Sequence, residues 1–70
     1  MKITTQDGKV IAAHDIEISG CEIKCIPVND IRKREVCGIY KDRIRATAIF
    51  AEMTCTGWNN KNPEYVMPKE

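Results

Sequence analysis

The sequence contains no leucine, and aromatic side chains make up only 6% of its 70 residues. Its apolar volume comes instead largely from isoleucine and valine, whose β-branched side chains favour pleated strands. No apolar run approaches the length of a membrane-spanning helix, and no apolar segment of a secretion signal follows Lys2. The composition therefore predicts a soluble, strand-rich protein of the cytoplasm.

A large excess of either charge is also missing. The sequence has eleven Lys and Arg residues and ten Asp and Glu residues, which gives a formal net charge of +1. This balance excludes nucleic-acid binding driven by bulk charge. A domain of this size buries only roughly 60% of the surface that its unfolded chain exposes, so it commonly needs a staple, a metal or a partner subunit.

The four cysteines do not follow the spacing of a zinc site. They lie at positions 21, 25, 37 and 55, without the tight loop that usually opens a zinc motif. Cys21 and Cys25 fall on one side of a predicted strand, about 13 Å apart, which is too far to share a metal. We predict free thiols that act as small apolar side chains, with no metal and no cofactor; a zinc site and a disulfide remain as alternatives.

The first 40 residues carry the signals of strands and turns. Asp7 and Gly8 stand between two β-branched stretches and predict a two-residue type I′ hairpin. The alternation breaks at 12–14, which predicts a bulge or bend. Alternating polar and apolar residues predict further strands at 15–18, 21–25 and 36–40.

A helical period begins after Asp42, which is suited to cap a helix, and runs to about Cys55, with Gly57 placed to end it. The helix carries two apolar faces. The bulky face consists of Ala46, Ile49, Phe50 and Met53, and the smaller one on the opposite side consists of Ile44, Ala48, Ala51 and Cys55.

These signals predict an α+β fold, an antiparallel β-meander of four or five strands packed on one C-terminal α-helix and followed by an irregular tail. Residues 1–57 form the domain and residues 58–70 a C-terminal arm. The expected core contains Ile3, Val10, Ile16, Ile18, Ile23, Ile39, Ala46, Ile49, Phe50 and Met53.

The second helix face raises the question of what covers it, because one small sheet buries only one side of a helix. A homodimer related by a two-fold axis through Ile44, Ala48, Ala51 and Cys55 is the simplest closed arrangement, and a higher oligomer also remains open. The alternative is that the tail folds back, so that Trp58, Tyr65 and Met67 cover this face within one chain.

No group of residues specifies catalysis, since the sequence has no phosphate loop and no nucleophile motif. We therefore expect a binding protein and not an enzyme. Basic residues gather in one part of the chain, which predicts either a solvated charged edge or an anion site for a nucleotide phosphate or an acidic protein surface. The candidates are Arg32, Arg34, Lys41, Arg43 and Arg45, with Trp58 and Tyr65 as aromatic partners.

Three segments resemble a group of small accessory proteins encoded by phages and prophages of Gram-positive bacteria. The segments are the opening MKITTQDGK, the stretch from Gly38 to Met53, and the ending YVMPKE. The corresponding patterns of the group are MKIxTQDGK, GxYKTEERAKEVLEEI and YxMPE. Ile44, Ala48 and Ala51 depart from the group, which usually has charged residues there, and the four cysteines are not part of its pattern.

The resemblance implies no catalytic residues, and it implies a counter-defence role in the host bacterial cytoplasm. Such a protein would be an oligomer that sequesters a nucleotide second messenger or occludes a host defence protein. The alternative is a small structural or interaction module of the host or prophage, with or without a metal held by its cysteines and with no immune role.

Overall fold

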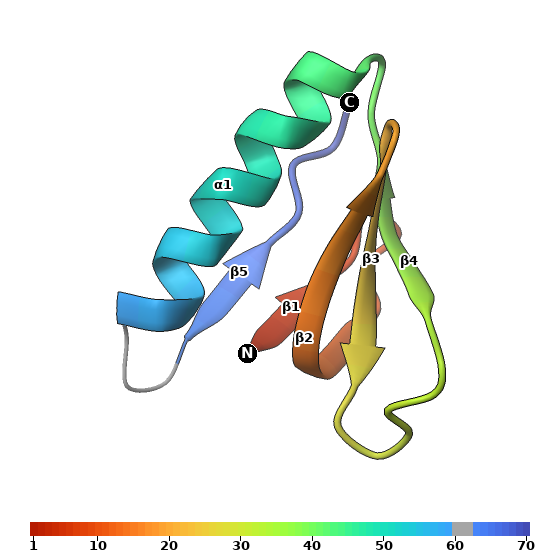
Figure 1. Cartoon of the computed structure of the whole chain (residues 1–70), viewed down its shortest axis with the longest axis vertical. Coiled ribbons are helices and arrows are strands. Elements are labelled where there is room, and N and C mark those ends of the chain that lie inside the picture. Colours follow the sequence, from red (N-terminus) through yellow and green to blue (C-terminus); the bar gives the residue numbers. More distant parts are fainter. Residues whose placement is uncertain (60–62) are drawn as a thin grey trace.

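The computed structural model describes residues 1–59 and 63–70, and the side chains of residues 1–56 and 63–70. Within these residues, one helix packs against a five-stranded sheet of order β4-β3-β2-β1-β5 (Figure 1). The fold is α+β, as the sequence predicts. The elements are β1 (Lys2–Thr4), β2 (Val10–Ser19), β3 (Glu22–Pro27), β4 (Glu35–Ile39), α1 (Arg43–Asn59) and β5 (Glu64–Val66).

Strands β1 to β4 form the predicted antiparallel meander, whereas β5 lies parallel to β1. The sheet is therefore mixed and not wholly antiparallel. Lys2 N donates to Pro63 O at 3.0 Å and Met67 N donates to Thr4 O at 2.8 Å, so the backbone of the tail continues the sheet. The stretch expected to be an irregular arm thus contributes an edge strand.

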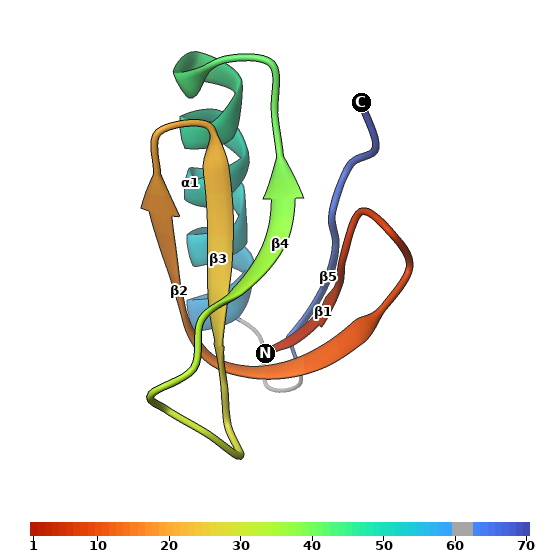
Figure 2. The ribbon, with the colours of Figure 1, turned by 90° about the vertical axis from the view of Figure 1, so that its right-hand side faces the viewer.

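Strand β2 bends where its register with β3 shifts, between Ala13 and Asp15. This irregularity confirms the predicted break at 12–14. The first half of β2 pairs with β1 and the second half pairs with β3, so the sheet curls around the core (Figure 2).

The β1–β2 turn differs from the predicted type I′ hairpin. Thr5 N donates to Lys9 O at 2.7 Å and Gly8 N donates to Thr5 O at 3.0 Å, which closes a three-residue loop. Only Gly8 has a positive φ in this loop, at 91°, whereas a type I′ turn needs two such residues. The three-residue loop pairs Ile3 with Ile11. A two-residue loop would shift this pairing by one residue, and because side chains alternate along a strand, the observed register places Val10 on the face opposite to Ile3. Val10 is 56% exposed, so its assignment to the core is wrong.

Ile39 is also exposed, contrary to prediction. The register between β3 and β4 shifts between Ile23 and Lys24, which leaves Cys37 as an extra residue in β4. Cys37 and Gly38 are both buried as a result. Gly38 packs under a tyrosine ring: a Cβ there would lie 2.8 Å from the hydroxyl oxygen of Tyr40.

The start of α1 is as predicted, and its end is not. Asp42 Oδ1 accepts a hydrogen bond from Arg45 N at 2.8 Å, as expected of an N-cap. The helix continues through Gly57 to Asn59, so the predicted end at Gly57 is wrong. None of the described helical residues form a segment long and apolar enough to span a membrane.

The core lies between α1 and the curled sheet. Five predicted core residues are buried, namely Ile3, Ile23, Ala46, Ile49 and Met53, while Ile16, Ile18 and Phe50 are only partly buried beside it. Tyr40, just before the start of α1, is buried as well. The other buried apolar residues are Ile11, Ala13, Cys25, Cys37, Tyr65 and Met67.

Met53→Ala should lower the free energy of unfolding by about 2–5 kcal/mol, because it leaves a cavity at a fully buried position. Phe50→Ala should have a smaller effect, since part of that ring already meets water. Urea denaturation of both variants measures the difference. A larger loss for Phe50→Ala would contradict the placement of the core.

Candidate functional site

The side of α1 opposite the core is apolar and open. Ile44, Ala48, Ala51 and Cys55, the outer stripe, are all exposed, and Ile44 retains 83% of its accessible surface. Ala46, Ile49 and Met53 on the other side are buried. The two faces predicted from the helical period are therefore both present, and the sheet covers only the bulky one.

Residues 63–70, the described part of the tail, fold back on their own chain without covering the outer stripe. The Tyr65 hydroxyl donates to Glu52 Oε1 at 2.8 Å, and Arg45 Nε lies 2.6 Å from Glu70 Oε1. Burial raises the pKa of Tyr65, and the bond to Glu52 raises it further. Both helix partners, Arg45 and Glu52, lie on one flank of α1. The described tail is therefore fixed beside the stripe and leaves it exposed.

Gln6 connects the β1–β2 loop with β4 and with the tail. Its side-chain oxygen accepts from Ile39 N at 2.8 Å, and its amide nitrogen donates to Ile39 O at 3.2 Å and to Pro68 O at 3.1 Å. The Tyr40 hydroxyl donates to the same Pro68 oxygen at 3.1 Å. This network holds the end of β4, just before α1, against the chain's last residues.

The predicted basic group does not come together. Arg32 and Arg34 lie in the β3–β4 loop, at the opposite end of the molecule from Lys41 and Arg43 at the start of α1 (Figure 1). Arg34 Nε contacts Glu17 Oε1 at 3.0 Å, and the guanidinium of Arg45 is held by the side-chain carboxylate of Glu70. Among the described residues, the side chains of the other three form no ion pair.

Of the two aromatic candidates, Tyr65 is not available for stacking. Tyr65 is buried in the core, so its ring does not present a face to a base. The side chain of Trp58 lies outside the described residues.

A hollow of about 350 Å³ lies between the start of β2 and the β3–β4 loop. Ile11 and Ala13 point into the core, so their neighbours Val10 and Ala12 point outward. We call this hollow the outer trough. Its exposed apolar floor consists of Val10, Ala12 and Val28, and its rim carries Lys9, Lys33 and Glu35. The remaining lining residues are Ile11, Pro27 and Asn29.

The rim charges interact with one another. Lys9 Nζ lies 3.0 Å and Lys33 Nζ 3.7 Å from the same Glu35 oxygen. The hydrogen bond from Lys9 lowers the pKa of Glu35, and the same bond raises the pKa of Lys9. Both lysine side chains stay largely exposed, whereas Glu35 is mostly covered, so the rim presents an excess of positive charge.

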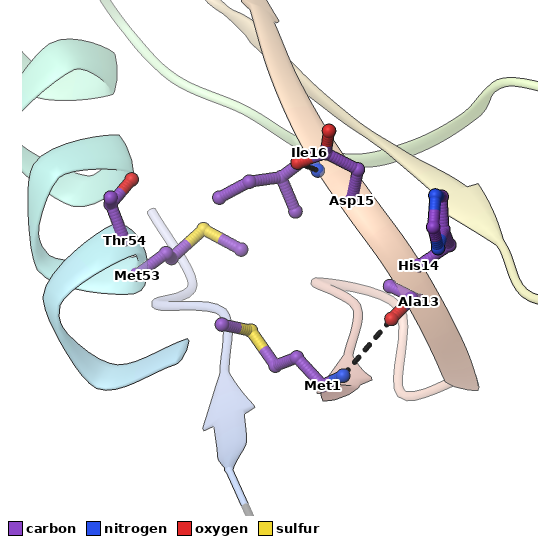
Figure 3. A pocket seen from close by; sticks show the side chains of 7 residues that line it. All are labelled: Met1, Ala13, His14, Asp15, Ile16, Met53 and Thr54. Atoms are coloured by element: carbon purple, nitrogen blue, oxygen red, sulfur yellow. Dashed lines mark hydrogen bonds between the residues drawn. The ribbon is translucent and has the colours of Figure 1, made fainter. Parts of the chain in front are cut away.

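A smaller cavity of about 70 Å³ lies between β2 and α1. Figure 3 shows Met1, Ile16 and Met53 reaching toward it, while His14 points away. The Met1 ammonium donates to Ala13 O at 2.9 Å, which ties the chain's first residue to β2. The cavity is lined largely by apolar groups and is too small for a nucleotide.

All four cysteines carry free thiols in the structure. Cys25 and Cys37 are buried on neighbouring strands, Cys21 is half-buried and Cys55 is exposed. Burial raises the pKa of both inner thiols, and for Cys37 the hydrogen bond with Cys25 raises it further. No cluster of three or more His, Cys, Asp or Glu side chains suited to a metal occurs in the part of the chain that is described.

The free energy of unfolding should fall at alkaline pH. Cys25, Cys37, Tyr40 and Tyr65 all have raised pKa values in the folded state, and their ordinary values are 9.0 for Cys and 10.0 for Tyr. The unfolded chain therefore loses these protons first, so stability is full below about pH 9 and declines above it.

Urea denaturation between about pH 8 and pH 11 tests this dependence. Cys37→Ala should make the decline shallower, and Cys55→Ala, at an exposed thiol, is the matched control. A constant free energy of unfolding across this range would contradict the burial of these groups.

Sequence reasoning missed the outer trough and the role of Gln6. The trough depends on the hairpin register, which the three-residue loop sets, and Gln6 acts on a strand 33 residues away. The one local signal for the trough and for the role of Gln6 is the turn sequence Thr-Gln-Asp-Gly, which contains Gln6 and precedes the trough.

No protein-family model matches this chain, and neither a curated protein nor a solved structure matches it.

Proposed function

We propose that the protein is a non-enzymatic binding protein that works as a homodimer joined through the outer stripe of α1. The observation that carries this proposal is the exposure of Ile44, 83%, on the side of the helix opposite the core. A large β-branched side chain in water loses the stabilisation that burial of its apolar surface would bring. The tail, the rival cover, is anchored on the helix flank.

The stripe has the shape that close helix packing requires. Its residues recur at spacings of four, three and four, and the two alanines at its centre allow two backbones to approach. In a two-fold antiparallel pair, Ala48 and Ala51 lie near the axis and Ile44 lies near Cys55 of the second copy. Such a dimer gives the small domain the partner subunit that its size calls for.

The resemblance of three segments to phage and prophage accessory proteins supports a more specific proposal. The dimer acts against host defence in the bacterial cytoplasm, either by sequestering a nucleotide signal or by occluding a defence protein. For a nucleotide, Lys41 and Arg43 are the binding residues that the fold leaves open, since both are exposed beside the first turn of α1.

Native mass spectrometry of the purified protein tests the nucleotide proposal. Spectra are recorded before and after incubation with a panel of cyclic nucleotides and ADP-ribose derivatives. We expect a bound nucleotide in the wild type, its loss in Lys41→Gln/Arg43→Gln, and its retention in the matched control Arg32→Gln/Lys69→Gln. A wild type that binds none of the panel would remove the nucleotide mode and leave occlusion of a protein.

A further inference from the structure

We propose that the outer trough binds an acidic segment of a partner protein in extended conformation, with apolar side chains on the floor and carboxylates on the lysine rim. The inference rests on the proposed binding role, and it names the chemical class of the partner. It does not depend on self-association, because the outer stripe and the outer trough share no residue.

The floor of the trough is an apolar surface without a cover. Val10 and Val28 are 56% and 58% exposed, and Ala12 between them is exposed as well. Val28 N donates to Ala12 O at 3.0 Å, which holds the β3 end of the floor against β2. The floor is therefore built on paired backbone, so it does not have to order itself when a partner binds.

The rim supplies the charge complementarity. Lys9 and Lys33 together carry two positive charges against the one negative charge of Glu35, which both already contact. At the other end an adjoining hollow of about 370 Å³ shares Ala12 and Val28 with the trough and contains the neutral pair Lys2–Glu64, at 3.4 Å. The excess positive charge lies at one end only, so carboxylates of a partner bind best there.

The form of the surface favours a peptide over a nucleic acid. Two hollows in succession across β2 suit an extended chain, whose side chains alternate between the floor and the solvent. A nucleic acid needs several phosphate contacts, whereas this rim offers one unbalanced charge and the whole chain has a net charge of +1.

Binding is tested with synthetic probes and the full chain. The probe is a fluorescein-labelled peptide of about nine residues that alternates glutamate with valine, long enough to cross both hollows. Three comparison probes separate the contributions: glutamate alternating with serine, lysine alternating with valine, and a single-stranded DNA oligonucleotide. Fluorescence anisotropy gives the affinities, and backbone amide NMR shifts locate the bound peptide.

We expect the glutamate–valine peptide to bind more tightly than the three comparison probes, with NMR shifts centred on Val10, Ala12 and Val28. Lys9→Gln/Lys33→Gln should weaken it about tenfold, since rim charges of this kind set the encounter and the register. The matched control Lys24→Gln/Lys69→Gln removes the same charge at two lysines that line neither hollow, and it should leave the affinity unchanged. Val28→Ser, at an exposed position, should also weaken binding without unfolding the domain.

Several results would overturn the inference. They are equal weakening by the two double variants, tightest binding by the lysine or DNA probe, and absence of binding by the glutamate–valine peptide. The same titration with Ala48→Glu/Ala51→Lys, which alters only the outer stripe, should give the wild-type affinity. Failure of the dimer and failure of the trough are thus observed separately.

Discussion

A chain that lacks residues 63–70 should not fold at room temperature. This segment contributes β5, which pairs with β1, and it contributes the buried side chains of Tyr65 and Met67. Loss of one large core side chain alone removes about 2–5 kcal/mol, and a small domain has little more than that in total. Far-UV circular dichroism and amide NMR dispersion of the shortened chain measure the effect.

The control for this truncation removes only Lys69 and Glu70. That chain keeps β5 and the core, and it loses the exposed ion pair between Arg45 and Glu70. Because such pairs contribute about 0–1 kcal/mol, we expect a cooperative unfolding transition close to that of the full chain. A folded chain without residues 63–70 would show that the tail is dispensable, against its place in the sheet.

The hairpin at Asp7 and Gly8 shows where local sequence signals reached their limit. The dipeptide correctly predicted a turn, but the choice between a two-residue and a three-residue loop set the register of β1 on β2. That choice decided whether Val10 or Ile11 entered the core, since strand side chains alternate. Both residues are β-branched, so their own propensities did not distinguish them.

The helix was predicted more accurately because its period repeats over several turns. Asp42 as N-cap and the two apolar faces are as predicted, while the end at Gly57 is wrong. The candidate site was likewise predicted only in part. The outer stripe follows from the helical period, whereas the trough and the separation of Arg32 from Arg43 depend on contacts between distant segments, which local patterns do not encode.

Ala48→Glu/Ala51→Lys should convert the dimer into a folded monomer. The two long side chains fall at the centre of the outer stripe, where only residues as small as alanine let two helix backbones approach. Burying their charges there also costs several kcal/mol per ion in lost hydration, which pairing across the two-fold axis offsets only with excellent geometry. In the separated chain both positions are exposed and three residues apart, so the charges favour the helix slightly. The melting temperature of the variant should also be independent of protein concentration, because the melting temperature depends on concentration only when unfolding is coupled to dissociation of a dimer.

Arg43→Glu/Thr47→Lys is the matched control for this variant. It also places opposite charges on exposed positions of α1, but on the flank beside the outer stripe. We expect this control to keep the wild-type mass in solution. Dissociation of the control as well would point to a general effect of charge on the helix and not to packing of the stripe.

Sedimentation equilibrium of the wild type and of Ala48→Glu/Ala51→Lys, at micromolar to high micromolar concentrations, tests the proposed dimer most directly. We predict twice the chain mass of 8.0 kDa for the wild type and the single-chain mass for the variant, with unchanged far-UV circular dichroism. A wild type that remains a single chain at the highest concentration would contradict self-association through the outer stripe.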